Sequence, residues 1–262
     1  YVLEELATAG IEPSVILTAP DRPAGRGLEM KSPPVKDWAL EQNIPVLQPE
    51  SLKEDNDSLD LLKNSEWDLF IVAAYGKILP KEVIDLPRRG VLNVHPSLLP
   101  RFRGASPVES QILGDEKETG VTIMQIDEQM DHGPIVAQAS IVPEEWPIRA
   151  SMLEELLARE GGKLLAEAIS PWLNAEFEAT AQEHDKATFT KKIKKEDGEI
   201  DLNADGYQNY LKFSAYDEWP GIFFFKDGKR IKITDAEYKN GVFMPLKVIP
   251  EGKKEVDYSS VM

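Results

Sequence analysis

The sequence predicts an α/β fold with a mostly parallel sheet and flanking helices, followed by a second, small β-rich domain. The first observation is that short apolar runs with strand character alternate with helix-like patterns as far as residue 173, which is typical of βαβ units. The second is a change of character beyond that point, where a polar stretch with little periodicity leads to short strand-like pieces. We therefore predict a domain at 1–174, a linker at 175–188 and a β-rich domain at 189–262.

Each element of the first domain has a local signal. An amphipathic helix is predicted over 1–9, and Ser51 is a suitable N-cap for a helix that carries Leu59, Leu61 and Leu62. The other helices are predicted at 36–42, from Ser106 or Pro107 to Gly114, and at 149–173 with an interruption at Gly161-Gly162. Strands are predicted at 15–18, 44–47, 67–74, 91–94, 121–126 and 135–139. In the second domain, a hairpin is predicted from 222–225, the turn 226–229 and 230–233.

Composition and charge limit the classes of function. The 262 residues can bury a sizeable core, and because they include no cysteine, disulfides, thiolate nucleophiles and cysteine zinc sites are excluded. The net charge of −16 lies in the first part of the chain, since 13 basic and 13 acidic residues balance from Thr190 onward. An acidic body disfavours nucleic-acid binding, although a local basic patch is sufficient for it. No apolar run is as long as a membrane span, and the chain opens with neither a start methionine nor a signal peptide, so we expect a cytoplasmic protein whose front segment is missing.

The stretch from Gly90 to Gly104 is where we expect the chemistry. Asn93 and His95 end an apolar strand and point to the same side of it, and Pro96 stops the strand because it cannot donate to a sheet ladder. Ligands bind at the carboxyl ends of strands in open α/β sheets. An amide donor beside a titratable imidazole can stabilise an oxyanion and move a proton at neutral pH. Judged alone, a turn-capping Asn and a satisfied interior His are equally good interpretations.

Two motifs resemble the signatures of formyltransferases that use 10-formyltetrahydrofolate. The first is Asn-x-His-Pro-Ser-Leu-Leu-Pro from Asn93, followed by Arg-Phe-Arg-Gly, and the second is the block from Gly120 to Ile135. In that family the acidic residue before x-Gly in the second block is catalytic, which implies that Asn93, His95 and Asp131 are the catalytic set. The resemblance also implies a Rossmann-like formyltransferase fold with a barrel-like C-terminal domain, and a strand with a Gly-Thr-Pro turn ahead of residue 1 that this sequence lacks.

Three further features resemble the family members that formylate the methionyl group of initiator methionyl-tRNA. They are the loop Asp21–Gly27 continuing to Ser32–Lys36, the run Ala73–Pro80, and the segment Phe189–Leu202 followed by Trp219-Pro220-Gly221. The approach to that Trp-Pro, Ser214–Glu218, departs from the family pattern. The resemblance implies that initiator methionyl-tRNA and 10-formyltetrahydrofolate are the substrates and that the C-terminal domain binds tRNA.

The chemistry implied is formyl transfer to an amine through a tetrahedral intermediate. Asn93 and a protonated His95 are suited to donate to the developing oxyanion. Asp131 is suited to orient His95, to raise its pKa, and to help remove the amine proton. His132 is expected to be a turn residue and His184 a solvated one, and because metal-ligand spacing is lacking no metal site is expected.

The substrate contacts implied are less specific. The turn Ser97-Leu98-Leu99-Pro100 resembles the family's folate-contacting turn, and Tyr75 and Gly76 are assigned to the same cleft, with core packing as the alternative. Candidate tRNA contacts are Arg22, Arg26, Lys31, Lys36, Arg101, Arg103, Lys191 and Lys192. The first loop is framed by Pro and Gly with few charge partners, which favours phosphate contacts over solvated charge. An acidic body around basic loops would also exclude non-specific RNA.

Three other functions stay open. The chain could formylate a nucleotide-sugar amine or glycinamide ribonucleotide, although the first loop and the C-terminal domain argue against both. It could hydrolyse formyltetrahydrofolate, with water as the acceptor. It could also be a non-catalytic module that binds RNA or folate. We expect a monomer with no membrane partner.

Overall fold

The computed structural model describes residues 1–24 and 29–261, and the chain gathers into two compact units. Unit 1 holds Tyr1–His95, Thr122–Gln138 and Ala158–Gln182. Unit 2 holds Pro96–Val121, Ala139–Leu157 and Glu183–Met262. The chain therefore passes from one unit to the other several times, and the last segment of unit 1 ends at Gln182.

Unit 1 alternates helices and strands, which confirms the predicted α/β class. Its helices are α1 (Val2–Thr8), α2 (Pro34–Glu41), α3 (Asn56–Lys63), α4 (Lys81–Ile84) and the second part of α6 (Ala150–Leu173). Its strands are β1 (Ile16–Leu17), β2 (Arg22–Ala24), β3 (Glu29–Lys31), β4 (Val46–Leu47), β5 (Phe70–Ala73), β6 (Val91–His95) and those parts of β8 (Thr119–Gln125) and β9 (Ile135–Ile141) that fall within the unit.

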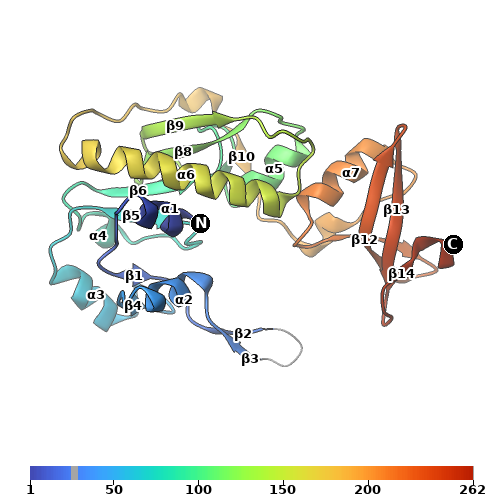
Figure 1. Ribbon diagram of the computed structural model, residues 1–262, viewed down its shortest axis with the longest axis horizontal. Helices are drawn as coiled ribbons and strands as arrows, with labels where there is room; N and C mark the ends of the chain where they lie inside the picture. Colours follow the sequence, from blue (N-terminus) through green and yellow to red (C-terminus); the bar gives the residue numbers. More distant parts are fainter. Residues whose placement is uncertain (25–28, 262) are drawn as a thin grey trace. The chain divides into compact units, whose positions relative to one another are not determined.

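The central sheet orders its strands β5-β6-β8-β9 (Figure 1). β5 and β6 are parallel, with Val72 opposite Asn93, whereas β6 and β8 are antiparallel, with His95 opposite Thr122. A separate parallel pair joins β1 to β4. The parallel pairs agree with the predicted βαβ units, and the antiparallel pair arises because residues 96–118 return the chain to the end at which β6 finishes.

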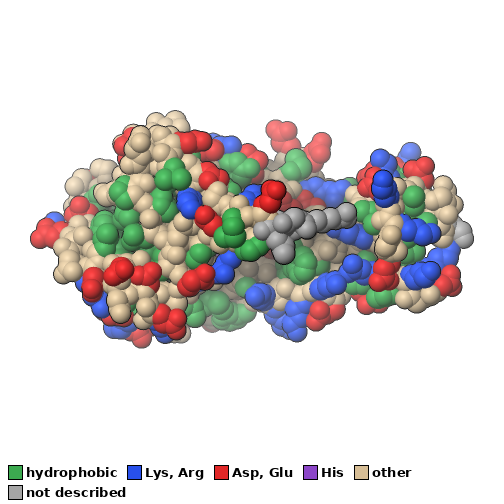
Figure 2. All heavy atoms as spheres, turned by 90° about the horizontal axis from the view of Figure 1, so that it is seen from below, with side chains coloured by type: hydrophobic (Ala, Val, Ile, Leu, Met, Phe, Trp, Pro, Cys, Tyr) green, Lys and Arg blue, Asp and Glu red, His purple; other side chains and the backbone are tan. Residues whose placement is uncertain are grey.

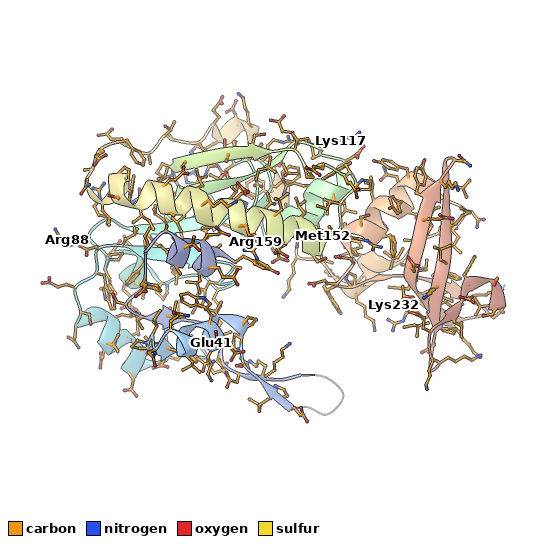
Figure 3. The ribbon with its side chains drawn as sticks, viewed as in Figure 1. Glu41, Arg88, Lys117, Met152, Arg159 and Lys232 are labelled. Atoms are coloured by element: carbon orange, nitrogen blue, oxygen red, sulfur yellow. The ribbon has the colours of Figure 1, made fainter. Side chains whose placement is uncertain are left out.

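Two helix predictions are wrong in detail. Ser51 lies in a turn that precedes α3, and the N-cap is Asp55, whose carboxylate accepts from the backbone N–H of Ser58 at 2.9 Å. Helix α6 runs without a break through the predicted interruption. A Cβ on Gly162 would lie 2.8 Å from Glu5 Cβ, so the glycine permits the close approach of α1. Arg159 projects from α6 toward α1 (Figure 3), with Nη1 3.2 Å from Glu5 Oε1.

Unit 2 packs helices against an antiparallel sheet. Its helices are α5 (Pro107–Leu113), the first part of α6, α7 (Gly206–Ala215) and the short 3₁₀ turns His184–Lys186, Lys195–Gly198 and Tyr258–Ser260. Its strands are β7 (Arg103–Gly104), β10 (Phe189–Thr190), β11 (Ile222–Lys226), β12 (Lys229–Lys239), β13 (Val242–Pro250) and β14 (Val256–Asp257). One apolar core joins α5, α6, α7 and the strands, and it includes Ile112, Leu153, Leu211 and Ile233, each at most 2% exposed.

The predicted hairpin of the second domain is confirmed, and a helix beside it was missed. Lys226 pairs with Lys229, and Asp227 and Gly228 between them have φ of +51° and +72°, as a type I′ turn requires. Helix α7 was not predicted; it begins at the N-cap Asp205. The expected linker is also more structured than predicted, because β10 pairs with β7 and an isolated bridge joins Thr180 to Ile135.

Candidate active site

Asn93 and His95 lie at the carboxyl end of β6, as the sequence predicts. The strand ends at His95, immediately before Pro96, and its alternation places both side chains on one face of the sheet. His95 is 4% exposed, whereas Asn93 is part-exposed. The side-chain amide of Asn93 has no hydrogen-bond partner among the described residues, so it can donate to a ligand.

Asp131 meets His95 from the loop between β8 and β9. Its Oδ1 lies 3.7 Å from His95 Nδ1, and the two side chains are 16% and 5% exposed. That distance is too long for a hydrogen bond but short enough for an ion pair once the imidazole is protonated. On the neighbouring strand, the Thr122 hydroxyl accepts from Gln138 Nε2 at 2.8 Å. The predicted catalytic residues are therefore brought together in one unit, around a buried imidazole.

The loop that carries Asp131 is fixed by several local contacts. Asp131 itself has φ of +49°, in the left-handed region that Asp tolerates better than most residues. His132 Nδ1 lies 2.7 Å from Asp127 Oδ2, so His132 is a turn residue that bonds within the loop. A Cβ on Gly133 would lie 1.9 Å from the carbonyl oxygen of Gln125. The position can therefore hold only glycine without a backbone shift.

A hollow of about 380 Å³ in unit 1 was not foreseen from the sequence. Ile84, Pro87 and Ile126 supply apolar lining, and Lys81 and Asp127 are among its polar residues. The hollow is completed by Asp85, Gly90, Gln125 and Glu128. The spacing of the sequence gives no signal for this group, because its members come from α4, the segment before β6, the last residue of β8 and the loop after it.

The expected folate residues have mixed environments. In unit 2, Ser97 is fully buried and its hydroxyl donates to the Arg101 carbonyl oxygen at 2.8 Å, and Leu99 is 3% exposed. Leu98 and Pro100 keep part of their surface. In unit 1, burial raises the pKa of the Tyr75 hydroxyl, and the side chain packs beside an apolar cluster that includes Leu59. Gly76 is exposed.

The first loop has more charge partners than expected. Arg22, in β2, hydrogen-bonds Glu50, and Lys36 Nζ lies 2.7 Å from Asp21 Oδ2. Hydrogen bonds from Gln48 and Lys36 hold the pKa of the Asp21 carboxyl below its usual value. Lys31 is exposed at the end of β3, and Arg26 lies outside the described residues.

The candidate tRNA contacts of unit 2 differ in how far their side chains are buried. Arg103 is 3% exposed and its Nη2 lies 2.9 Å from His184 Nδ1, so the expected tRNA contact at Arg103 is corrected. His184 is exposed, as expected, although its ring also contacts Arg103. Arg101 is half-buried and hydrogen-bonds Glu116. Lys191 and Lys192 are exposed. Figure 2 shows further basic side chains over the part that contains the C-terminal strands, where Lys229, Lys239, Lys247, Lys253 and Lys254 are exposed.

Comparison with known proteins identifies the family. Residues 2–169 match the model of formyl transferase, and residues 192–245 match the formyl transferase C-terminal domain. The chain belongs to the formyl transferase family. The methionyl-tRNA formyltransferase of Chloroflexus aurantiacus is 44% identical over 236 residues, which are 90% of this chain and 76% of that protein.

Solved structures of the formyl transferase fold resemble this chain over most of its length. HypX from Aquifex aeolicus in complex with tetrahydrofolic acid has a TM-score of 0.67 at 16% identity and covers 95% of this chain and 46% of its own. Methionyl-tRNA formyltransferase from Clostridium thermocellum has a TM-score of 0.62 at 19% identity and covers 94% of this chain and 100% of its own. Within residues 1–24 and 29–261, no helix has the length and apolar character needed to cross a bilayer.

Proposed function

We propose that this formyltransferase transfers the formyl group of 10-formyltetrahydrofolate to the amino group of the methionyl moiety of initiator methionyl-tRNA. The observation that carries the proposal is the Asn93–His95–Asp131 constellation in a chain whose relatives bear that enzyme name. The amine nitrogen attacks the formyl carbon, the carbonyl oxygen takes up the negative charge, and the bond from carbon to N10 of the folate then breaks.

Each of the three residues has a distinct role in this mechanism. The Asn93 amide donates to the developing oxyanion, and protonated His95 donates to the same oxygen. Asp131 stabilises the imidazolium and, directly or through water, accepts the proton that the attacking amine loses. The leaving N10 takes up a proton. No covalent bond to the enzyme forms, which suits a site whose groups are an amide, an imidazole and a carboxylate.

We assign the folate donor to two sets of residues that can be tested separately. The first is the set expected from the sequence: Ser97, Leu98, Leu99 and Pro100 with Tyr75 and Gly76. The second is the hollow in unit 1, whose size and mixed lining of apolar, carboxylate and amide groups suit a flat, hydrogen-bonding pterin. We expect Ile126→Trp to raise KM for the donor if the hollow is used, and Leu98→Ala to raise it if the turn is used.

We assign tRNA phosphates to the basic side chains that the sequence singles out, apart from the one that the structure buries. The residues are Arg22, Arg26, Lys31, Lys36, Arg101, Lys191 and Lys192; Arg103 is left out because it is buried. Arg22→Ala, which also frees Glu50, should weaken tRNA binding and reduce the slope of log affinity against log salt by about 1. An unchanged slope would remove Arg22 from the interface.

The function is tested by the choice of acceptor. Purified chain, 10-formyltetrahydrofolate and methionyl-tRNA should give formylmethionyl-tRNA, whereas a nucleotide-sugar amine and glycinamide ribonucleotide should give little product. Formate release without any acceptor would instead indicate a hydrolase. Asn93→Ala should lower kcat by about 10²–10³-fold, as for other oxyanion donors, and an unaffected rate would contradict a catalytic role. We propose that the enzyme acts in the cytoplasm as a monomer, which a mass measurement in solution checks.

A further inference from the structure

We propose that Gln182 is a positioning residue for formyl transfer, because its side-chain amide holds the loop that presents Asp131. The proposal rests on the proposed function, since it concerns how Asp131 is kept in place for catalysis. Gln182 lies in the segment that the sequence predicts as a polar linker, where a glutamine would ordinarily be solvated. Here it is 5% exposed.

The amide of Gln182 makes two hydrogen bonds to the catalytic loop. Its Nε2 donates to the backbone carbonyl oxygen of Asp131 at 3.0 Å and to that of Gly133 at 2.7 Å. An amide nitrogen has two hydrogens, so one side chain can satisfy both carbonyls. The two acceptors lie on either side of His132. The amide thus fixes both ends of the three-residue segment that begins at the catalytic carboxylate.

The backbone around Gln182 places the amide in register with the loop. Thr180 and Ile135 form an antiparallel bridge, with backbone hydrogen bonds of 2.7 and 2.8 Å in the two directions. Because the two segments are antiparallel, Gln182, two residues after Thr180, lies opposite Gly133, two residues before Ile135. Side chains two residues apart in an extended segment share a face. The bridge therefore aims the amide at the loop.

The loop conformation is one that needs such support. Asp131 has φ of +49° and Gly133 fits closely over the Gln125 carbonyl oxygen. The direction of the Asp131 side chain follows from this backbone, and it sets the 3.7 Å separation from His95 Nδ1. A residue that fixes the Asp131 carbonyl therefore fixes the carboxylate as well. A misplacement of about 1 Å at a reacting group can cost on the order of 10²-fold in rate.

The first test replaces the amide by an apolar side chain of similar length. We expect Gln182→Met to lower kcat for methionyl-tRNA formylation by about 10- to 100-fold while KM for both substrates stays within about twofold, because the loss falls on the position of Asp131. The matched control is Asn209→Leu in unit 2, which removes another buried amide that donates to a backbone carbonyl, at 2.8 Å from Asp201. The control should lose stability but keep kcat.

The second test asks whether Gln182 acts through Asp131. In an Asp131→Asn background, adding Gln182→Met should change kcat little, because the positioned group is already disabled. Two residues that act independently would instead give multiplied losses. This result would contradict the positioning role even if Gln182→Met alone lowers kcat.

The third test uses pH and a substitution of nearly the same shape. In Gln182→Glu a protonated carboxyl can donate one hydrogen bond to the loop, whereas the ionised form faces two carbonyl oxygens with none to give. The ratio of its kcat to that of the wild type, taken at the same pH, should therefore be highest at low pH and fall as that carboxyl ionises. A ratio that does not change with pH would contradict the positioning role of these hydrogen bonds. Gln182→Glu also tests the proposal if Gln182→Met does not fold.

The outcomes separate this inference from the proposed function. If the wild type does not formylate methionyl-tRNA, or if Asp131→Asn is fully active, the proposed function fails first. If the wild type is active and Asp131→Asn is not, the proposed function stands. In that case, Gln182 variants with the kcat and pH profile of the wild type would overturn only the positioning role of Gln182.

Discussion

Substitution of Gly133 by alanine tests whether the catalytic loop must keep its backbone position. A Cβ at this residue would lie 1.9 Å from the Gln125 carbonyl oxygen and 3.0 Å from its carbonyl carbon. Real Cβ atoms essentially never approach a heavy atom closer than 3.0 Å, so the backbone must move apart by about 1 Å. Because Asp131 is two residues away, the same movement shifts its carboxylate relative to His95.

The expected loss follows from that displacement. A shift of about 1 Å at a reacting group corresponds to roughly 10²-fold in kcat, and overpacking costs about 1–3 kcal/mol of unfolding free energy. The assay is single-turnover formyl transfer to methionyl-tRNA, with thermal unfolding measured in parallel. Gly162→Ala is the control, since it places a Cβ 2.8 Å from Glu5 Cβ in the packing of α1 on α6. A Gly133→Ala variant with wild-type kcat would show that the loop does not need its present backbone position, and so would an equal loss of kcat in both variants.

Two further predictions concern stability and pH in unit 2. Burial, aided by Asp115, raises the pKa of Tyr207 to about 12, and burial raises the pKa of Tyr216 to about 12. The unfolded state therefore loses these two protons first, and the unfolding free energy should fall as pH rises from 10 to 12. Tyr207→Phe should remove one of the two protons from the slope of unfolding free energy against pH, and an unchanged slope would contradict this. Burial, with smaller contributions from Glu154 and Asp217, raises the pKa of the Glu109 carboxyl, so its favourable neutral form is lost as pH rises through the folded pKa. Glu109→Gln should therefore have a higher Tm than the wild type at pH 7, with the difference closing toward pH 4, and a lower Tm at pH 7 would refute this.

The parts of the site that the sequence predicts are those with local causes. Asn93 and His95 share a face because strand side chains alternate, and Pro96 ends the strand because it has no N–H to donate. Both effects act within a few residues, so both can be read without a structure. The position of Asp131 near them is different, because no local rule brings the loop after β8 back to the end of β6; only the second motif indicated it.

The parts that were missed depend on where distant segments meet. Gln182 lies in a polar stretch with no periodicity, and its role appears only when the bridge from Thr180 to Ile135 lays that stretch along the catalytic loop. Arg103 was expected to contact tRNA, but it is 3% exposed and its guanidinium contacts His184, which lies 81 residues away in the sequence. Neither the spacing of residues in the sequence nor the composition predicts that a charged group is buried against a distant partner.

The proposed mechanism is tested most directly by comparing kcat for formyl transfer to methionyl-tRNA in His95→Ala, Asp131→Asn and the double variant. If Asn93, His95 and Asp131 act as one unit around the buried imidazole, each single variant should lose rate strongly and the double variant should be little slower than His95→Ala. Losses that multiply, or a single variant with wild-type kcat, would contradict the mechanism.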